Sequence, residues 1–447
     1  MEYDLNHGML KLYSAILVIF IGTYLSASKV IDFDVIKKGK DDNNTLLVIG
    51  GIQGDEPGGF VSASILATHY EITKGSVWIV PNLNFYSILE RSRGPYGDMN
   101  RKFATLSKKD PEYKTVQRIK SYIKNDKVKM VVNLHDGSGY YRHKYVDKIH
   151  SPYKWGQCSI IDQKSIDVKM YANLAEISSK VVNHVNKHIL KEEDRYHQHN
   201  TKTRDGDEEM AKSLTYYAIN QGKPAFGNEA SKNLPTHKRV YYHLLALEKY
   251  MDIMGIEYKR KFKLTSLGVY NALNKDIYIS LCNNKITLPL SEIRSTLSYM
   301  PLKSNSIVEF KASNPLLTIY KKNNIYIIQY GNRKLTQLKA QYKEHDDKKA
   351  NVKFVVDSNH KNVAFGSILE VKNNFLVKDN KDYRVNIIGF SNHNKKETGI
   401  KISRAKIPKR FSIDKKGCIY RVEYYTKGSD KVKHGKFAGM VLIKFKS

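Results

Sequence analysis

The sequence has few cysteines and few acidic residues. Its three cysteines, Cys158, Cys282 and Cys418, are odd in number, widely separated and without a CxxC pair, which excludes a disulfide framework and argues against cysteine-ligated zinc. With 75 Lys and Arg against 44 Asp and Glu, the formal net charge is +31. Such a charge favours an anionic partner, either nucleic acid, anionic lipid or an acidic wall polymer. Because the lysines form no long block, a solvated basic surface is the alternative.

Long apolar runs are missing except near the N-terminus. Leu12–Leu25 is apolar, with Lys11 before it and the small residues Ser26–Ser28 after it. This layout predicts a secretory signal peptide over residues 1–28, because the stretch is short for a bilayer span. An uncleaved membrane anchor is the alternative. Export would make nucleic acid a poor partner for the positive charge.

The length of 447 residues indicates two or three domains. From about Val30 to about Gly255, apolar strand-like runs alternate with helical patterns. The expected strands are Thr45–Ile49, Val77–Val80, Met130–Leu134 and Pro224–Gly227, and the expected helices are Pro111–Lys124, Asp167–Leu190 and His237–Gly255. Several of the strand-like runs are apolar without alternation, as in strands buried on both faces. We therefore expect an α/β domain over residues 29–256, with a mainly parallel, mixed sheet flanked by helices.

Beyond about Tyr258 the helical periodicity fades. Short runs rich in Ile, Val, Tyr and Leu alternate with Asn, Lys and Gly turns, which is typical of β-hairpins. The polar stretch Lys343–Asn351 is the best linker candidate. We expect two β-rich domains here, a small one over residues 257–343 and a β-sandwich-like one over 344–447.

The first candidate site is the segment Gly50–Gly59, which reads GGIQGDEPGG. It places Gln53 and Glu56 in a loop after a strand, and His135 follows a second strand, VVNL. Ligands of open α/β sheets bind at the carboxyl ends of the strands, so the three side chains converge if the strands are parallel neighbours. Such N and O donors with an open position are typical of catalytic zinc. On spacing alone, a satisfied histidine and a helix N-terminal acid explain the same residues.

Two further segments carry candidate residues. RSRGPYGDMNRKF contains Arg91, Arg93, Asn100 and Arg101 in a glycine-rich loop, and arginine clusters bind carboxylates through paired hydrogen bonds. PAFGNEASK contains Glu229 at the end of an apolar strand, where a carboxylate is a candidate general base. Surface charge and an exposed strand-end acid are the alternatives for these two segments.

The order of these motifs, GGIQGDEPGG, DMNRKF, NLHDG and NEAS, resembles the carboxypeptidase A-like zinc metallopeptidase family over roughly Val30 to Gly255. Within that family, the glutamine, the signal peptide and the two β domains resemble the periplasmic D,L-carboxypeptidases that determine helical cell shape. Those enzymes trim peptidoglycan tripeptide stems to dipeptides by releasing meso-diaminopimelate. The resemblance implies a periplasmic enzyme that acts on muropeptides and not on nucleic acid.

The resemblance also assigns the metal ligands. Gln53, Glu56 and His135 would hold one zinc ion per chain. Most of the broader family has histidine where this sequence has Gln53. An amide oxygen is a weaker donor than an imidazole nitrogen, so zinc affinity should fall while the metal stays strongly electrophilic.

The remaining roles are carried over by motif. Glu229 would take a proton from the attacking water and then help the leaving amine depart. Arg93 would stabilise the oxyanion, although Arg91 lies in the same loop and the two are not distinguished. Asn100 and Arg101 would clamp the terminal carboxylate of the substrate, and Arg91 is a further candidate contact to the substrate.

Two other functions compete with this one. An N-acyl amino acid amidohydrolase of the aspartoacylase and succinylglutamate desuccinylase type shares the GGIxGDEPGG pattern, but those enzymes are typically cytoplasmic. A catalytically inactive wall-binding protein is the other alternative, against which the retained Glu229 argues. In either case the C-terminal β domains are candidates for contact with the cell wall or a protein.

Overall fold

The computed structural model describes residues 32–40, 42–304, 308–392, 397–427 and 435–446, so the predicted signal peptide lies outside it. None of the described helices is long and apolar enough to cross a membrane. The chain divides into two compact units. The first comprises Met1–Leu273 with Gly331–Arg333, and the second comprises Asn274–Tyr330 with Lys334–Ser447. The three-domain division at residues 257 and 344 stays a prediction.

A seven-stranded sheet forms the centre of the first unit, in the order β1-β4-β2-β5-β10-β8-β9. Its strands are β1 (Ile36–Gly39), β2 (Thr45–Ile49), β4 (Ser76–Val80), β5 (Val128–Gly137), β8 (Cys158–Ile161), β9 (His197–Asn200) and β10 (Ala225–Ser231). The four central strands run parallel, while β1 and β8 are antiparallel to their neighbours β4 and β10. The predicted mixed, mainly parallel sheet is therefore confirmed. Two small pairs accompany it, β3 (Tyr70–Lys74) with β11 (Glu257–Arg260), and β6 (Tyr140–Tyr141) with β7 (His150–Ser151).

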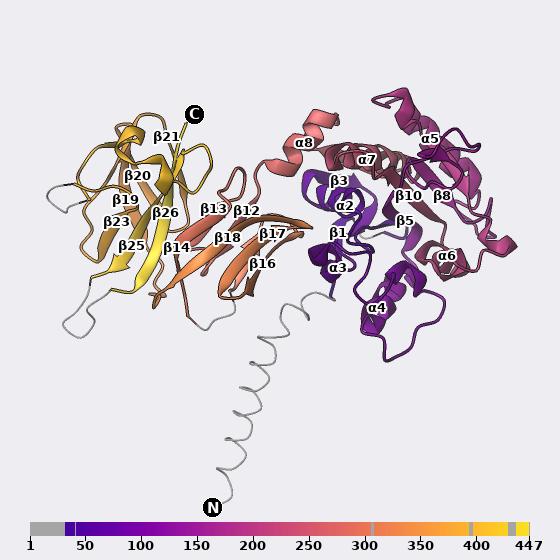
Figure 1. Ribbon diagram of the computed structural model, residues 1–447, viewed down its shortest axis with the longest axis horizontal. Helices are drawn as coiled ribbons and strands as arrows, with labels where there is room; N and C mark the ends of the chain where they lie inside the picture. The colour runs from indigo at the N-terminus through magenta and orange to yellow at the C-terminus, as the bar shows by residue number, and fades with distance from the viewer. Residues whose placement is uncertain (1–31, 41, 305–307, 393–396, 428–434, 447) are drawn as a thin grey trace, which may run out of the picture. The chain divides into compact units, whose positions relative to one another are not determined.

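Helices cover both faces of this sheet (Figure 1). The α-helices of the unit are α2 (Pro57–His69), α3 (Phe85–Glu90), α4 (Tyr113–Lys124), α5 (Leu174–Asn186), α6 (Leu214–Asn220), α7 (Thr236–Ile253) and α8 (Ser266–Asn274). Helices α2, α5 and α7 pack together on one face, and α4 and α6 lie against the other. The three predicted helices are confirmed, but α5 begins later than expected because the Asn173 side chain caps it by accepting a hydrogen bond from Glu176 N. Helix α8 was not predicted.

Glycines bring the start of α2 directly against β5. A Cβ atom on Gly58 would lie 2.2 Å from Asp136 Oδ1, and one on Gly59 would lie 2.5 Å from the Leu134 carbonyl oxygen. Any larger residue at either position would push the helix away from the strand. The PGG sequence therefore sets the separation between Glu56, which precedes α2, and His135 in β5.

The second unit is β-rich, as predicted. One part has two sheets, β13-β12-β15 and β14-β18-β17-β16. Their strands are β12 (Tyr278–Leu281), β13 (Ile286–Pro289), β14 (Thr296–Leu302), β15 (Phe310–Ala312), β16 (Leu317–Lys322), β17 (Ile325–Tyr330) and β18 (Arg333–Tyr342).

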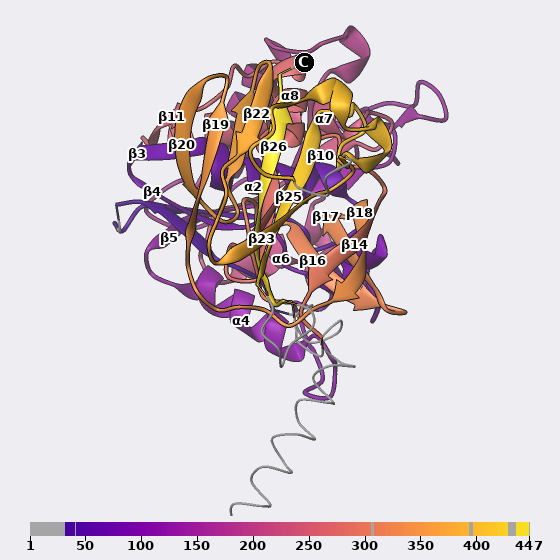
Figure 2. The same ribbon diagram turned by 90° about the vertical axis from the view of Figure 1, so that its left-hand side faces the viewer.

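Two further sheets of this unit, β20-β19-β22-β24 and β21-β26-β25-β23, enclose one apolar core that contains Phe354, Phe375 and Val441. Figure 2 shows strands of both sheets. They are β19 (Asn351–Val356), β20 (Asn359–Ala364), β21 (Ile368–Val371), β22 (Asn374–Val377), β23 (Tyr383–Ile387), β24 (Ile402–Ser403), β25 (Ile419–Thr426) and β26 (Phe437–Phe445). Buried residues alternate with more exposed ones along β19, as expected for a strand with one buried face.

Candidate metal centre and active site

Three donor atoms from the predicted ligands converge at the carboxyl ends of β2 and β5. Gln53 Oε1 and Glu56 Oε2 each lie 3.0 Å from His135 Nδ1, and all three side chains are buried. Donors on one tetrahedral ion with bonds of about 2.0–2.2 Å lie about 3.3–3.6 Å apart, so these atoms need to separate by only a few tenths of an ångström to hold one. No group of three or more His, Cys, Asp and Glu side chains in the described residues is arranged to hold a metal. The candidate centre here differs from such a group because one of its three donors is an amide.

Asn133 contacts the other ring nitrogen of His135. Its Nδ2 lies 2.7 Å from His135 Nε2, while its Oδ1 is buried without a hydrogen-bond partner. A histidine that binds a metal through Nδ1 carries its proton on Nε2, and that proton needs an acceptor. A half-turn of the Asn133 amide exchanges its nitrogen and oxygen and brings Oδ1 to Nε2. Asn133 therefore suits a metal-bound His135.

Asp98 orients the glutamine. Its Oδ1 accepts a hydrogen bond of 2.8 Å from Gln53 Nε2, which leaves Gln53 Oε1 on the side of His135. Its Oδ2 accepts a 3.0 Å hydrogen bond from Arg93 Nε. The sequence-based analysis did not single out Asp98, although the residue lies two positions before Asn100 in the DMNR motif.

Arg93 lies beside the candidate ligands and Arg91 does not. Arg93 Nη1 lies 3.3 Å from Glu56 Oε1. Burial would lower the pKa of Arg93, but the carboxylates of Asp98 and Glu56 outweigh burial and raise it, so the guanidinium stays charged. Arg91 ends α3 in a left-handed conformation, with φ of 55°, and its Nε donates to the Asn332 carbonyl oxygen within the same unit.

Glu229 lies directly beside His135 across the sheet, because the two are register partners in β10 and β5. Its side chain is buried, and its Oε2 has no hydrogen-bond partner. Burial raises the pKa of Glu229 well above its ordinary value, and the negative charges of Glu56 and Asp136 act in the same direction. A buried carboxylate with an unpaired oxygen is suited to exchange a proton with a bound reactant.

Asn100 and Arg101 lie in a single 3-10 turn, Met99–Arg101, further along the same loop. Asn100 Oδ1 accepts a 3.0 Å hydrogen bond from Leu214 N at the start of α6, so the amide position is fixed. Arg101 Nε lies 3.5 Å from Glu209 Oε2, and its Nη1 donates to the Asn100 carbonyl oxygen at 3.2 Å. The Arg101 side chain is partly exposed, so its guanidinium is accessible to a ligand.

Asp136 faces away from the candidate metal position because side chains alternate along β5. Its Oδ2 accepts hydrogen bonds from Gly58 N at 2.7 Å and Arg239 Nη1 at 3.0 Å, and its Oδ1 lies 3.3 Å from His243 Nε2. Burial would raise the pKa of Asp136, but the hydrogen bond with His243 and the charge of Arg239 lower it. Arg239 and His243, one helical turn apart on α7, carry no motif that sequence-based analysis recognises.

Lys232 follows β10 and contacts the loop that carries the candidate ligands Gln53 and Glu56. Its Nζ lies 2.7 Å from Asp55 Oδ2 and 3.5 Å from Glu56 Oε1. The sequence-based analysis did not identify Lys232, because its contact with Asp55 spans 177 positions in the chain.

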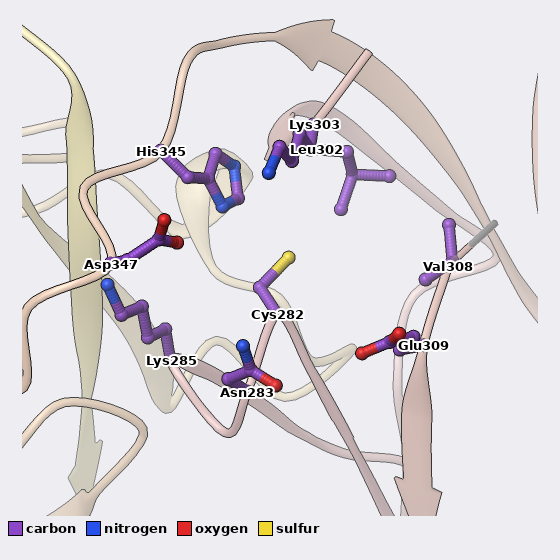
Figure 3. Close-up of a pocket in the computed structure, with 9 residues that line it drawn as sticks. All are labelled: Cys282, Asn283, Lys285, Leu302, Lys303, Val308, Glu309, His345 and Asp347. Carbon is purple, nitrogen blue, oxygen red and sulfur yellow. The ribbon is translucent and has the colours of Figure 1, made fainter. Parts of the chain in front are cut away.

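A separate pocket of about 300 Å³ lies in the second unit (Figure 3). Figure 3 shows the Cys282 sulfur and the His345 ring turned toward the same space. The lining residues are Cys282, Asn283, Lys285, Leu302, Lys303, Val308, Glu309, His345 and Asp347. Burial raises the pKa of the Cys282 thiol to about 11, so the thiol is protonated at neutral pH and is a poor nucleophile. Cys282 therefore does not supply an activated nucleophile to this pocket.

Comparisons with known families match both parts of the chain. Residues 9–274 match the family described as the catalytic domain of the carboxypeptidase controlling helical cell shape. Residues 345–446 match the C-terminal domain of metallo-carboxypeptidases. A search of curated proteins finds no match.

Solved structures of one protein match nearly the whole chain. The apo form of the cell shape determinant protein Csd4 from Helicobacter pylori is 40% identical, with a TM-score of 0.82, and the match covers 93% of this chain and 100% of that one. Its tripeptide-bound form matches with the same identity, coverage and TM-score. The form bound to mDAP, described as a D,L-carboxypeptidase, is also 40% identical, with a TM-score of 0.82 and coverage of 92% and 100%. The chain therefore belongs to the family of metallo-carboxypeptidases that control helical cell shape.

Proposed function

We propose that the protein is a zinc-dependent D,L-carboxypeptidase that trims peptidoglycan tripeptide stems to dipeptides by releasing meso-diaminopimelate. The observation that carries the proposal is the convergence of Gln53 Oε1, Glu56 Oε2 and His135 Nδ1 beside Glu229. The match to a tripeptide-bound and an mDAP-bound carboxypeptidase over more than nine tenths of the chain supports the substrate.

Gln53, Glu56 and His135 would hold one zinc ion, and their two oxygens and one nitrogen are donors that zinc accepts. Zinc, when bound, supplies Lewis-acid polarisation of the scissile carbonyl and a water of lowered pKa. Asp98 keeps the amide oxygen of Gln53 available by accepting a hydrogen bond from its nitrogen. This contact explains how a glutamine serves at a position where the broader family has histidine.

Glu229 takes a proton from the attacking water and delivers it to the nitrogen of the leaving amino acid. Its raised pKa suits the second of these steps, in which the carboxyl group acts as an acid. Arg93 stabilises the negative charge that develops on the carbonyl oxygen, and its raised pKa keeps it cationic throughout.

Asn100 and Arg101 bind the terminal carboxylate of the substrate. Asn100 Oδ1 is occupied by Leu214 N, so its Nδ2 is the group that donates to the substrate. Arg101 adds a charged, planar donor pair that matches a carboxylate. Arg91 stays a weaker candidate for a substrate contact, because its Nε donates to a backbone carbonyl.

The alternative functions are not favoured. This chain matches the whole length of the carboxypeptidase Csd4, including the β-rich second unit. An enzyme that cleaves small N-acyl amino acids does not require such a unit. An abandoned site has no reason to keep Glu229 unpaired and buried beside the donor atoms. We propose that the protein is exported to the periplasm and that its β domains contact the cell wall or a protein partner.

The test is release of diaminopimelate from purified tripeptide muropeptide by the full-length protein. We expect no release after chelation, full release after one equivalent of zinc, and none from Glu229→Gln with the same bound zinc. Release by chelated protein, or equal release by the variant, contradicts the proposal. Hydrolysis of N-acyl amino acids in place of the muropeptide identifies the first alternative, and zinc binding without hydrolysis of either identifies the second.

A further inference from the structure

Lys232 is a cation at the candidate active site to which the proposed mechanism gives no role. It lies three residues beyond Glu229 and just past the end of β10. Its side chain is 30% exposed, and its Nζ pairs with Asp55 Oδ2 at 2.7 Å and lies 3.5 Å from Glu56 Oε1. We propose that Lys232 binds a carboxylate in the acyl part of the substrate, on the side of the scissile bond opposite the Asn100–Arg101 clamp. This inference rests on the proposed function.

A continuous series of contacts links the clamp to Lys232 through the candidate metal centre. Asn100 N donates to Asp98 Oδ1 at 2.9 Å, and Asp98 Oδ2 accepts from Arg93 Nε at 3.0 Å. Arg93 Nη1 lies 3.3 Å from Glu56 Oε1, which lies 3.5 Å from Lys232 Nζ. For a substrate with its terminal carboxylate at the clamp and its scissile carbonyl beside Arg93 and Glu56, we expect the acyl part to continue along this series to Lys232.

A comparison with Arg239 distinguishes Lys232 from a purely structural cation. Arg239 donates to Asp136 Oδ2 and to the carbonyl oxygens of Leu234 and Lys232, and its side chain is only 14% exposed. The Nζ of Lys232 makes one hydrogen bond of ordinary length, to Asp55 Oδ2. An ammonium group has three N–H donors, so donors remain for a ligand. The greater exposure of Lys232 makes those donors reachable.

The chemistry of the substrate supplies a matching group. In a peptidoglycan stem the residue before diaminopimelate is a glutamate linked through its γ-carboxyl, so its α-carboxylate stays free close to the scissile amide. A lysine ammonium recognises such a carboxylate through a charge-assisted hydrogen bond. We therefore expect Lys232 to select stems with a free α-carboxylate over stems in which that group is a primary amide.

The experiment compares two tripeptides that differ only in this group, a free carboxylate or a primary amide, using full-length zinc-loaded protein. Wild type should cleave the free acid with a kcat/KM roughly 10- to 100-fold higher than that of the amide. Lys232→Gln should reduce this preference to less than about 3-fold by slowing cleavage of the acid and leaving that of the amide nearly unchanged. Lys238→Gln, which removes the same charge from the start of α7, should keep the wild-type preference.

The inference is overturned if wild type does not distinguish the two substrates, which disproves recognition of the carboxylate without recourse to any variant. It is also overturned if Lys232→Gln with normal zinc content slows both cleavages equally, which shows that Lys232 only positions Asp55 and Glu56. If Lys232→Gln does not fold, Lys232→Arg should fold and keep the preference, and loss of preference in that variant also overturns the inference. Failure of wild type to cleave either tripeptide instead contradicts the proposed function.

Discussion

Asp136 and Glu229 are two buried carboxylates on neighbouring strands with opposite environments. Both lie at the carboxyl ends of β5 and β10, but Asp136 faces α2 and α7 whereas Glu229 shares the face of His135. The Asp136 oxygens are engaged by Gly58, Arg239 and His243, and its pKa is lowered. Glu229 has an unpaired oxygen and a raised pKa. One face of the sheet is thus built for stability and the other for reaction.

The largest expected effect comes from Glu229. Glu229→Gln removes the proton acceptor, so kcat should fall about 10³-fold, within the range found for general acid–base groups. The melting temperature should stay equal or rise, because the variant replaces a buried carboxyl group that has one unpaired oxygen with a neutral amide. Steady-state kinetics, zinc content and thermal unfolding check the three expectations. A large loss of stability would show that Glu229 is a structural acid like Asp136.

The second prediction concerns Asp136, on the opposite face of the sheet, and its contribution to stability. Asp136→Ala leaves Arg239 buried without its carboxylate partner and should lower the free energy of unfolding by about 3–5 kcal/mol. Urea unfolding at neutral pH measures this loss. In the double variant Asp136→Ala with Arg239→Met, part of the stability should return, since the unpaired cation is also removed. No recovery would show that the Arg239 ion pair is not the source of the loss.

A smaller effect is expected at Asn133, which lies on the reactive face. Asn133→Leu leaves the Nε2 proton of a metal-bound His135 without an acceptor, so zinc affinity should fall about 10- to 100-fold. Asn133→Asp, which supplies a stronger acceptor, should keep or raise the affinity. Competition with a chelator measures both variants. Equal zinc affinity in Asn133→Leu and wild type would show that Asn133 has no influence on the ring.

The sequence predicted those candidate site residues whose positions depend on the order of the strands. Gln53, Glu56, His135 and Glu229 each follow or end an apolar run, and parallel strands bring such positions to one edge. The choice between Arg91 and Arg93 was not predictable, because it depends on the left-handed end of α3.

The supporting residues were not predictable for a related reason. Asp98, Lys232 and Arg239 act through contacts that span 45, 177 and 103 positions. Such contacts depend on loop and helix packing, which hydrophobic periodicity does not report. The requirement for glycine at position 58 was not predictable for the same reason. A side chain there would collide with Asp136, which lies in a strand distant in the sequence.

The smallest expected effect is a difference between the two faces of the sheet in how stability depends on pH. Glu229 pairs with Cys158 on β8, and Cys158 pairs with His197 on β9, so these side chains lie on one face of the sheet. Burial lowers the pKa of both His197 and His199 on β9 from 6.5 to about 4. The charge of Arg142 acts in the same direction on His197. The unfolded chain therefore binds more protons than the folded one between pH 6.5 and 4, and stability falls as the pH is lowered through this window.

Asp136 makes stability depend on pH at lower pH values. Its folded environment favours the charged form, whereas burial of the two histidines favours the neutral form. Its folded pKa lies below 3.8, so the stability that it contributes is present above pH 3.8 and is lost only as the pH falls through the folded value. The double variant His197→Gln with His199→Gln should thus flatten the stability profile between pH 6.5 and 4 by on the order of 1 kcal/mol per ring, since both rings are partly exposed and screened. Urea midpoints at pH 7, 5.5 and 4 measure this change. If the slope of stability against pH between 6.5 and 4 is unchanged in the double variant, the loss of stability in acid comes from residues other than His197 and His199. The difference between the two faces of the sheet would then concern catalysis and not the pH dependence of stability.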